Sequence, residues 1–299
     1  MTWLFFALLA PFLYAIVNLV DDNLLKNVHK SPHSGAVVAG IFGGLPLISL
    51  FVYDLKSVSL AVLMSAILAG FFLSVFYFGY FSAFEKESPS VVIALIGTAP
   101  VFLAIFGYIF LGERLTKTQL IGGAVVLVAS IIMAIKREGK IKISKSIGYV
   151  FISLICTSLY SGFAKYSFDR SDFYTVYMYI SLGMLLGGLY FIYFLVISKK
   201  AKTLKRLRKN IKKYFFVFLA AELLALAAEF TMNKAISMGS VTLTRAIEGI
   251  QPAFVLLIAV LLSPLNKNMF REASEGGKLK KLLCIIAMAF GIYLILRNA

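Results

Sequence analysis

The chain has 299 residues, of which 60% are hydrophobic and only 15% are charged. A soluble domain is nearer half apolar and a quarter charged, so a single soluble core is excluded and lipid must surround much of this chain. The formal net charge of +16 falls in short segments between apolar runs. That distribution is typical of the cytoplasmic face of a membrane protein and not of a nucleic-acid-binding domain.

Ten apolar runs follow one another along the chain, each close to the length of about 20 residues that a helix needs to cross a bilayer. The runs are continuously apolar and too long for the alternating strands of a membrane β-barrel. The predicted spans are 3–24, 35–53, 59–84, 89–111, 118–135, 147–168, 174–197, 214–236, 240–262 and 280–297. We therefore predict an all-α membrane protein with ten transmembrane helices.

The second half of the chain repeats a bend found in the first. When the fourth span is moved onto the ninth by 152 residues, Gly97 coincides with Gly249 and Pro100 with Pro252. Proline removes a backbone hydrogen bond and bends a helix. Matched bends in two halves of a membrane protein indicate hinges beside a binding site.

A second match, at an offset of 146 residues, sets Tyr14 against Tyr160. Together the two matches predict a first five-helix repeat at 1–137, a basic linker at 138–146 and a second five-helix repeat at 147–299, all within one membrane domain. Because five is an odd number, the second repeat enters the membrane inverted, as in many secondary transporters.

The stretch Leu111-Gly-Glu-Arg-Leu-Thr-Lys117, followed by Gly122-Gly123 and an apolar helix, resembles the junction of the fourth and fifth spans of EamA-type carriers in the drug/metabolite transporter superfamily. This resemblance implies a central cavity lined mainly by the first, third, fourth, sixth, eighth and ninth spans. It also implies a functional monomer, since one chain then holds both halves of the pathway. The second repeat departs from the pattern, with Pro264-Leu265 where the first has Gly112-Glu113.

Two charged residues stand on one face of the predicted ninth span. Arg245, Glu248 and Pro252 are three and four residues apart, so their side chains share a helix face. The first repeat has Ile93 and Ile96 at the positions of the two charges, so the fold can be built without them. The alternative interpretation is that the arginine and the glutamate neutralise each other and only stabilise the bundle.

Two further charges, Lys165 and Glu229, lie in the predicted sixth and eighth spans. A charge at bilayer depth is costly and usually marks a substrate or ion path. We therefore predict a substrate or coupling-ion role within the group Lys165, Glu229, Arg245 and Glu248. A substrate carboxylate or phosphate suits the two bases, and a coupling proton suits the two acids. With Glu222, for which a structural role is favoured, the acids outnumber the bases, so a cationic substrate stays open.

Aromatic and amide side chains complete the predicted site. A buried tyrosine offers an apolar ring and a hydroxyl that can orient a ligand, whereas the alternative for any one ring is ordinary packing or an interfacial belt. Tyr14 and Tyr160 stand out because they coincide in the repeat, and Gln251 lies beside the ninth-span bend. The full predicted set is Tyr14, Asn18, Tyr77, Tyr80, Tyr160, Lys165, Glu229, Arg245, Glu248 and Gln251, with hinges at Gly97, Pro100, Gly249 and Pro252.

Lysine and arginine are unevenly divided between the two ends of the spans. Loops that follow odd-numbered spans carry 22 of these residues, against 4 in loops that follow even-numbered spans. The positive-inside rule then places both termini outside the cytoplasm. The segment 199–213 is predicted to lie on anionic lipid.

These patterns predict a secondary transporter that moves a small polar or amphipathic metabolite, amino-acid-like or otherwise charged, across the cytoplasmic (inner) membrane by alternating access. Coupling to protons is one route. No catalysis, cofactor, metal or nucleic-acid partner is expected. The alternatives are a membrane enzyme that acts on a lipid-like substrate, for which no catalytic motif is present, and a non-transporting scaffold.

Overall fold

The computed structural model describes residues 2–24, 28–85, 92, 96, 98–134, 146–262 and 278–297. All the regular structure in these residues is helical. The predicted hinge Gly97, the linker residues 138–145 and most of the segment 86–97 lie outside the described part of the chain.

The helices of the first half are α1 (Thr2–Leu24), α2 (Pro32–Gly43) continued by the 3-10 helix η2 (Leu45–Phe51), α3 (Leu60–Phe84), α5 (Ala99–Phe106) continued by the π-helical turn η3 (Gly107–Leu111), and α6 (Lys117–Ala134). Those of the second half are α7 (Ser146–Phe168), α8 (Phe173–Ile197), α9 (Ala201–Lys213), α10 (Phe215–Met238), α11 (Val241–Glu248), α12 (Gln251–Leu262) and α14 (Lys278–Leu296). Within the part of the chain that the structure describes, five stretches could each cross a membrane by length and composition: Pro32–Phe51, Leu60–Phe84, Phe173–Ile197, Phe215–Met238 and Val241–Ile258. Shorter apolar helices accompany them at Thr2–Asn18, Ala99–Leu111, Lys117–Ile132 and Leu282–Leu296.

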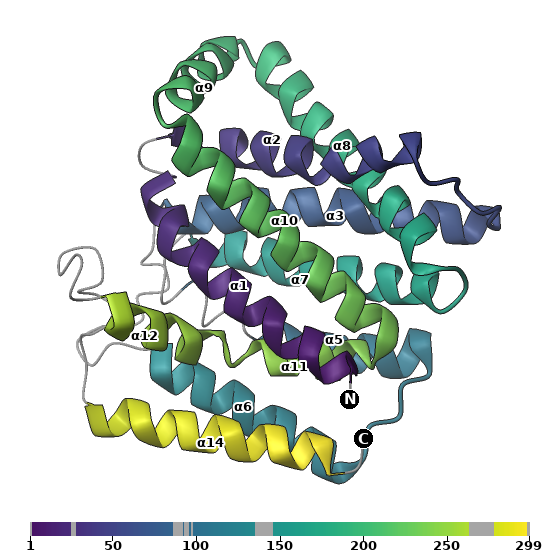
Figure 1. Ribbon diagram of the computed structural model, residues 1–299, viewed down its shortest axis with the longest axis vertical. Coiled ribbons are helices and arrows are strands. Elements are labelled where there is room, and N and C mark those ends of the chain that lie inside the picture. The colour runs from purple at the N-terminus through teal and green to yellow at the C-terminus, as the bar shows by residue number, and fades with distance from the viewer. Residues whose placement is uncertain are drawn as a thin grey trace.

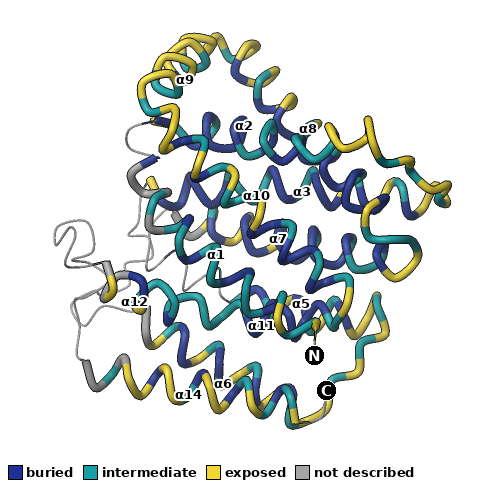
Figure 2. Tube along the Cα trace, in the orientation of Figure 1, coloured by how far each residue is buried: buried dark blue, intermediate teal, exposed yellow. Residues whose placement is uncertain are grey.

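The two halves of the chain interleave instead of forming separate bodies. Helix α3 packs against α7 and α8, α1 packs against α10 and α12, and α6 pairs with α14 at one edge of the molecule (Figure 1). Helix α1 begins, and α14 ends, at the same side of this stack, and α9 lies across the opposite side (Figure 1). Buried residues concentrate on α2, α3 and α7, while α9 and α14 carry long exposed stretches (Figure 2).

Large apolar side chains cover much of the outside. Phe216 is 84% exposed, Tyr193 is 64% exposed and Ile286 is 57% exposed, on three different helices. A water-soluble monomer rarely exposes apolar surface on this scale, whereas a bilayer solvates it. The outer surface is therefore that of a protein embedded in lipid.

The ninth predicted span is interrupted where the repeat indicated a bend. Helix α11 ends at Glu248, and α12 begins at Gln251 with Pro252 in its first turn. In the first half Pro100 is likewise the second residue of α5. A proline in the first turn of a helix costs no hydrogen bond, because its missing N–H would have no partner there. Both matched prolines thus begin a helix segment near mid-span.

Helices α3 and α8 approach closely through glycine. A Cβ atom added at Gly70 would lie 1.9 Å from the carbonyl oxygen of Ile180, and one at Gly183 would lie 2.0 Å from that of Ile67. Small residues at such crossings let two membrane helices make backbone contact, which substitutes for the hydrophobic driving force that lipid removes. These glycines set the spacing of the helices behind the site described below.

Replacing Gly183 by alanine is expected to lower the free energy of unfolding by about 1–3 kcal/mol, because the new methyl group forces α3 and α8 apart. The matched control is Gly148→Ala on α7, where a Cβ meets no described atom within 4 Å. That change should be neutral or stabilise by up to about 1 kcal/mol, since alanine suits a helix better than glycine. Unfolding of both variants in mixed detergent micelles measures the difference, and equal stabilities would contradict the assigned contact.

Candidate binding cavity

A cavity of about 140 Å³ lies between helices of both halves of the chain. Its lining residues on α1 belong to the second half of that helix, and all those on α10 except Glu229 belong to the first half, which follows α9. The cavity therefore lies toward the end of the bundle at which α9 is found. The residues of the predicted site and hinges that line it are Tyr14, Asn18, Tyr77, Tyr80, Pro100, Glu229, Arg245, Glu248, Gly249, Gln251 and Pro252. The structure therefore brings together most of the set inferred from sequence.

Glu229 is the centre of the polar contacts in this cavity. Its side chain is buried on α10, and its two carboxylate oxygens accept hydrogen bonds from the hydroxyls of Tyr14 and Tyr160, each at 2.5 Å. The Nδ2 atom of Asn233 lies 3.4 Å from Oε1. The two tyrosines that coincide in the sequence repeat thus meet on one carboxylate, one from each half of the chain. Tyr160 acts here through Glu229 and is itself fully buried.

Arg245 forms the second polar centre. Its Nη1 atom lies 2.8 Å from Oε2 of Glu248, and its Nε donates to Ser161 Oγ at 2.9 Å. The guanidinium also stands 5.3 Å from the centre of the Tyr160 ring. The ion pair proposed in the alternative interpretation therefore exists, but both of its members also line the cavity. Ser161 was missed from sequence, although it directly follows Tyr160.

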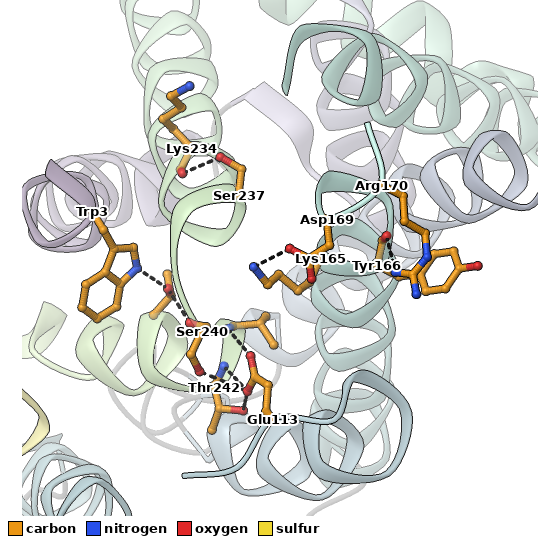
Figure 3. Close-up of polar contacts among 12 residues, drawn as sticks. Trp3, Glu113, Lys165, Tyr166, Asp169, Arg170, Lys234, Ser237, Ser240 and Thr242 are labelled. Atoms are coloured by element: carbon orange, nitrogen blue, oxygen red, sulfur yellow. Dashed lines mark hydrogen bonds and ion pairs between the residues drawn. The ribbon is translucent and has the colours of Figure 1, made fainter. Parts of the chain in front are cut away.

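The structure does not bring Lys165 into this group. Its Nζ atom is paired at 2.7 Å with Asp169, which directly follows the end of α7, and the lysine side chain does not line the cavity (Figure 3). Glu222, for which a structural role at a membrane face was favoured, does line it. Among the described residues, the charged lining side chains are three glutamates and one arginine.

A second cluster, missed from sequence, joins the two halves of the chain at the other end of α11. The Glu113 carboxylate follows η3 and accepts hydrogen bonds from the backbone N–H of Val241 at 2.7 Å, the Thr242 hydroxyl at 2.7 Å and the Ser240 hydroxyl at 3.0 Å (Figure 3). A carboxylate at a helix N-terminus satisfies free N–H groups and complements the helix dipole. We call Glu113, Ser240, Val241 and Thr242 the inter-repeat latch. Its residues do not line the cavity.

Trp3 packs beside the latch. Its indole Nε1 donates to Thr244 Oγ1 at 3.0 Å (Figure 3). A Cβ atom at Gly239 would lie 1.9 Å from the same nitrogen, so the indole sits directly on the α10–α11 turn. The start of α1 is thereby held against the same turn that Glu113 holds.

Buried charges in apolar helices, with a cavity shared by both halves, define a membrane protein of the transporter class. Residues 1–135 match the model of the EamA-like transporter family, and this match confirms, over those residues, the resemblance noted in the sequence. The chain is a multi-pass integral membrane protein.

Known proteins that are similar to the chain include a plant protein and a protein of solved structure. A chloroplastic WAT1-related protein of Arabidopsis thaliana is 33% identical over 98 residues, which is 30% of this chain and 24% of that relative. The match thus spans about a quarter of the relative's length. A solved crystal structure superimposes with a TM-score of 0.63 at 16% identity, over 98% of both chains. That likeness bears on the fold alone.

Proposed function

We propose that the chain is a secondary transporter that moves a small polar or amphipathic metabolite across the cytoplasmic membrane by alternating access. The observation that carries the proposal is the cavity itself. Charged side chains sit within apolar helices and are ordered around a space open to a ligand, with Tyr14 and Tyr160 of the two halves converging on Glu229. Intramembrane charges arranged in this way typically mark a substrate or ion path.

We further propose that the ten predicted spans form two inverted five-helix repeats. Several of the helix contacts support this, because they come in pairs that an inverted repeat would relate. The contact of α3 with α7 corresponds to that of α1 with α10, and the contact of α5 with α7 corresponds to that of α1 with α11 and α12. The contacts of α2 with α8 and of α6 with α14 each join two helices that are equivalent in the two repeats, so the repeat relates each of these contacts to itself. The two matched prolines add to this argument.

Alternating access requires a closed end as well as a site. The inter-repeat latch is our candidate for that closed end, because it lies one length of α11, about 12 Å, from the residues at the cavity. When the two halves rock, the contacts of Glu113 with the start of α11 would break and the path on that side would open. Glu229 is our candidate to carry a coupling proton.

The basic helix α9 supports the proposed orientation. Its apolar residues Leu204, Leu207 and Ile211 pack toward α2 and α10, and its lysines and arginines are mostly exposed. A helix with one apolar and one basic face suits the surface of a membrane that contains anionic lipid. We propose that α9 lies on the cytoplasmic leaflet, that both termini are outside, and that the transporter works as a monomer.

The test is reconstitution of the purified chain in liposomes after a screen for ligands. A metabolite that binds the folded state raises the melting temperature by mass action, so a panel measured at mildly acidic and neutral pH selects candidates. A hit should then exchange across the liposome membrane in counterflow, with no added nucleotide. A ligand that binds tightly but never crosses would overturn transport and leave a receptor or scaffold.

A further inference from the structure

We infer that the cavity takes an organic cation, an amine or ammonium group carried on an apolar or aromatic body. The inference rests on the proposed function, because it names the class of substrate for the same site. The sequence did not decide whether the substrate carries a positive or a negative charge. Three features of the structure decide it.

The first feature is the balance of charge. Glu222, Glu229 and Glu248 line the cavity, and Arg245 is the lining base in the described part of the chain. Lys165, which would have reduced this difference in charge, is paired with Asp169 just after the end of α7. Among the described lining residues Arg245 is paired with Glu248, so the surplus of negative charge is carried by Glu229, whose described donors are two hydroxyls and one amide. A positive group entering this space would offset that surplus, and a negative one would add to it.

The second feature is the state of the arginine. Arg245 donates to Glu248 at 2.8 Å and to Ser161 at 2.9 Å, and its side chain is only 7% exposed. An anionic substrate would have to break this pair and leave Glu248 without its partner in a low-dielectric site, which is costly. The guanidinium already makes hydrogen bonds to two side chains of the protein, so it is poorly suited to bind a carboxylate or phosphate of a substrate.

The third feature is the aromatic part of the cavity lining. The rings of Tyr14, Phe42, Phe76, Tyr77, Tyr80 and Phe81 all line the cavity. On α3 they form a continuous surface, with Phe76 stacked on Tyr80 at 5.7 Å between ring centres and Tyr77 stacked on Phe81 at 6.2 Å. The face of an aromatic ring carries negative potential and attracts a desolvated cation. The same rings can bury the apolar part of a ligand. The cavity therefore offers negative potential for the cationic group and apolar surface for the body that carries it.

Within this site Glu229 is the expected contact for the cation. Its oxygens accept from the two tyrosine hydroxyls, which fix the carboxylate toward the cavity. An oxygen of an ionised carboxylate has two acceptor positions, so Oε2, whose described donor is Tyr14, retains one for an ammonium N–H.

The test uses three probes that share a phenyl ring and differ in charge: 2-phenylethylamine is a cation, 2-phenylethanol is neutral and phenylacetate is an anion. Binding to the purified chain in detergent is measured by calorimetry at neutral pH, where the amine is protonated. We expect the amine to bind at least tenfold more tightly than the alcohol, and phenylacetate not to bind. Glu229→Gln should weaken binding of the amine at least tenfold and leave binding of the alcohol unchanged. The matched control is Glu85→Gln at the exposed end of α3, which should change neither.

Tighter binding of the alcohol or the acid, or no preference among the three, would overturn the inference, and this result needs only the wild-type chain. Counterflow in liposomes separates the inference from the proposed function. An amine that binds selectively but does not cross supports the cation site and contradicts transport. A phenylacetate that binds and crosses contradicts the cation site and supports transport.

Discussion

Replacing Glu113 by glutamine is expected to open the end of the pathway that the inter-repeat latch holds shut. The carboxylate receives one backbone N–H and two hydroxyls at 2.7–3.0 Å, and the amide that replaces it keeps one acceptor oxygen and no charge. Hydrogen bonds to a charged group contribute about 1.5–3 kcal/mol each. Loss of one of them should shift the balance of the two conformations by about tenfold to a hundredfold.

A cysteine in place of Ala164 reports this shift. Ala164 is fully buried on α7, in the same apolar cluster as Val241 of the latch and Leu103 of α5. In a background in which Cys156 and Cys284 are replaced by serine, the new thiol should resist a membrane-impermeant maleimide while Glu113 is present. It should react at least tenfold faster in Glu113→Gln, and counterflow should slow because one conformation then dominates. Glu85→Gln is the control of like chemistry, and equal labelling in all three proteins would contradict the latch.

The second large effect is expected at the pair of Arg245 and Glu248. Replacing Arg245 alone by isoleucine leaves Glu248 charged and unpartnered beside apolar helices, a change that costs about 3–5 kcal/mol in comparable buried pairs. Replacing both by isoleucine, the residue that the first repeat has at both positions, should restore the free energy of unfolding to within about 1 kcal/mol of the native chain. Transport should nevertheless be lost in the double variant, since the cavity loses its polar end.

The ion pair of Lys165 and Asp169 supplies the control for this cycle. Its members are also close in sequence, four residues apart, but Asp169 follows the end of α7, the pair lies outside the cavity, and the Asp169 side chain is 42% exposed. Because solvent at the half-exposed Asp169 screens the pair, Lys165→Met, Asp169→Asn and their combination should each change stability by less than about 1 kcal/mol. Transport should survive all three. A double variant of Arg245 and Glu248 that transports normally would return the pair to a purely structural role and favour the scaffold interpretation.

Hydropathy and the repeat predicted more of this structure than single residues did. The break between α11 and α12 followed from the coincidence of Pro100 with Pro252, because a proline acts on the backbone wherever a helix lies. Tyr14 and Tyr160 were found the same way, and their convergence on Glu229 needed only that the two halves be related in space.

For the residues that were misplaced or missed from sequence, the correct position depends on the depth of the side chain along its helix or on partners that are distant in the sequence. Lys165 lies one turn of α7 beyond Ser161, which is enough to move it from the cavity to Asp169. Glu222 was assigned to a membrane face, but it lines the cavity. Span boundaries read from sequence are uncertain by a few residues, and a shift of a few residues along a helix is enough to move a side chain from the membrane face to the cavity. Glu113 contacts residues 127–129 positions away, and no local pattern announces contacts at that separation.

The position of Trp3 has a practical consequence. It is the only tryptophan in the chain, and it rests on the α10–α11 turn through Thr244 and Gly239. Any rocking that separates the start of α1 from this turn changes the water and the hydrogen bonding around one indole. The intrinsic fluorescence of the unlabelled protein is then a spectroscopic signal for gate movement, with a red-shifted emission maximum marking the open gate. Each substrate, lipid and variant can be ranked by that one emission maximum.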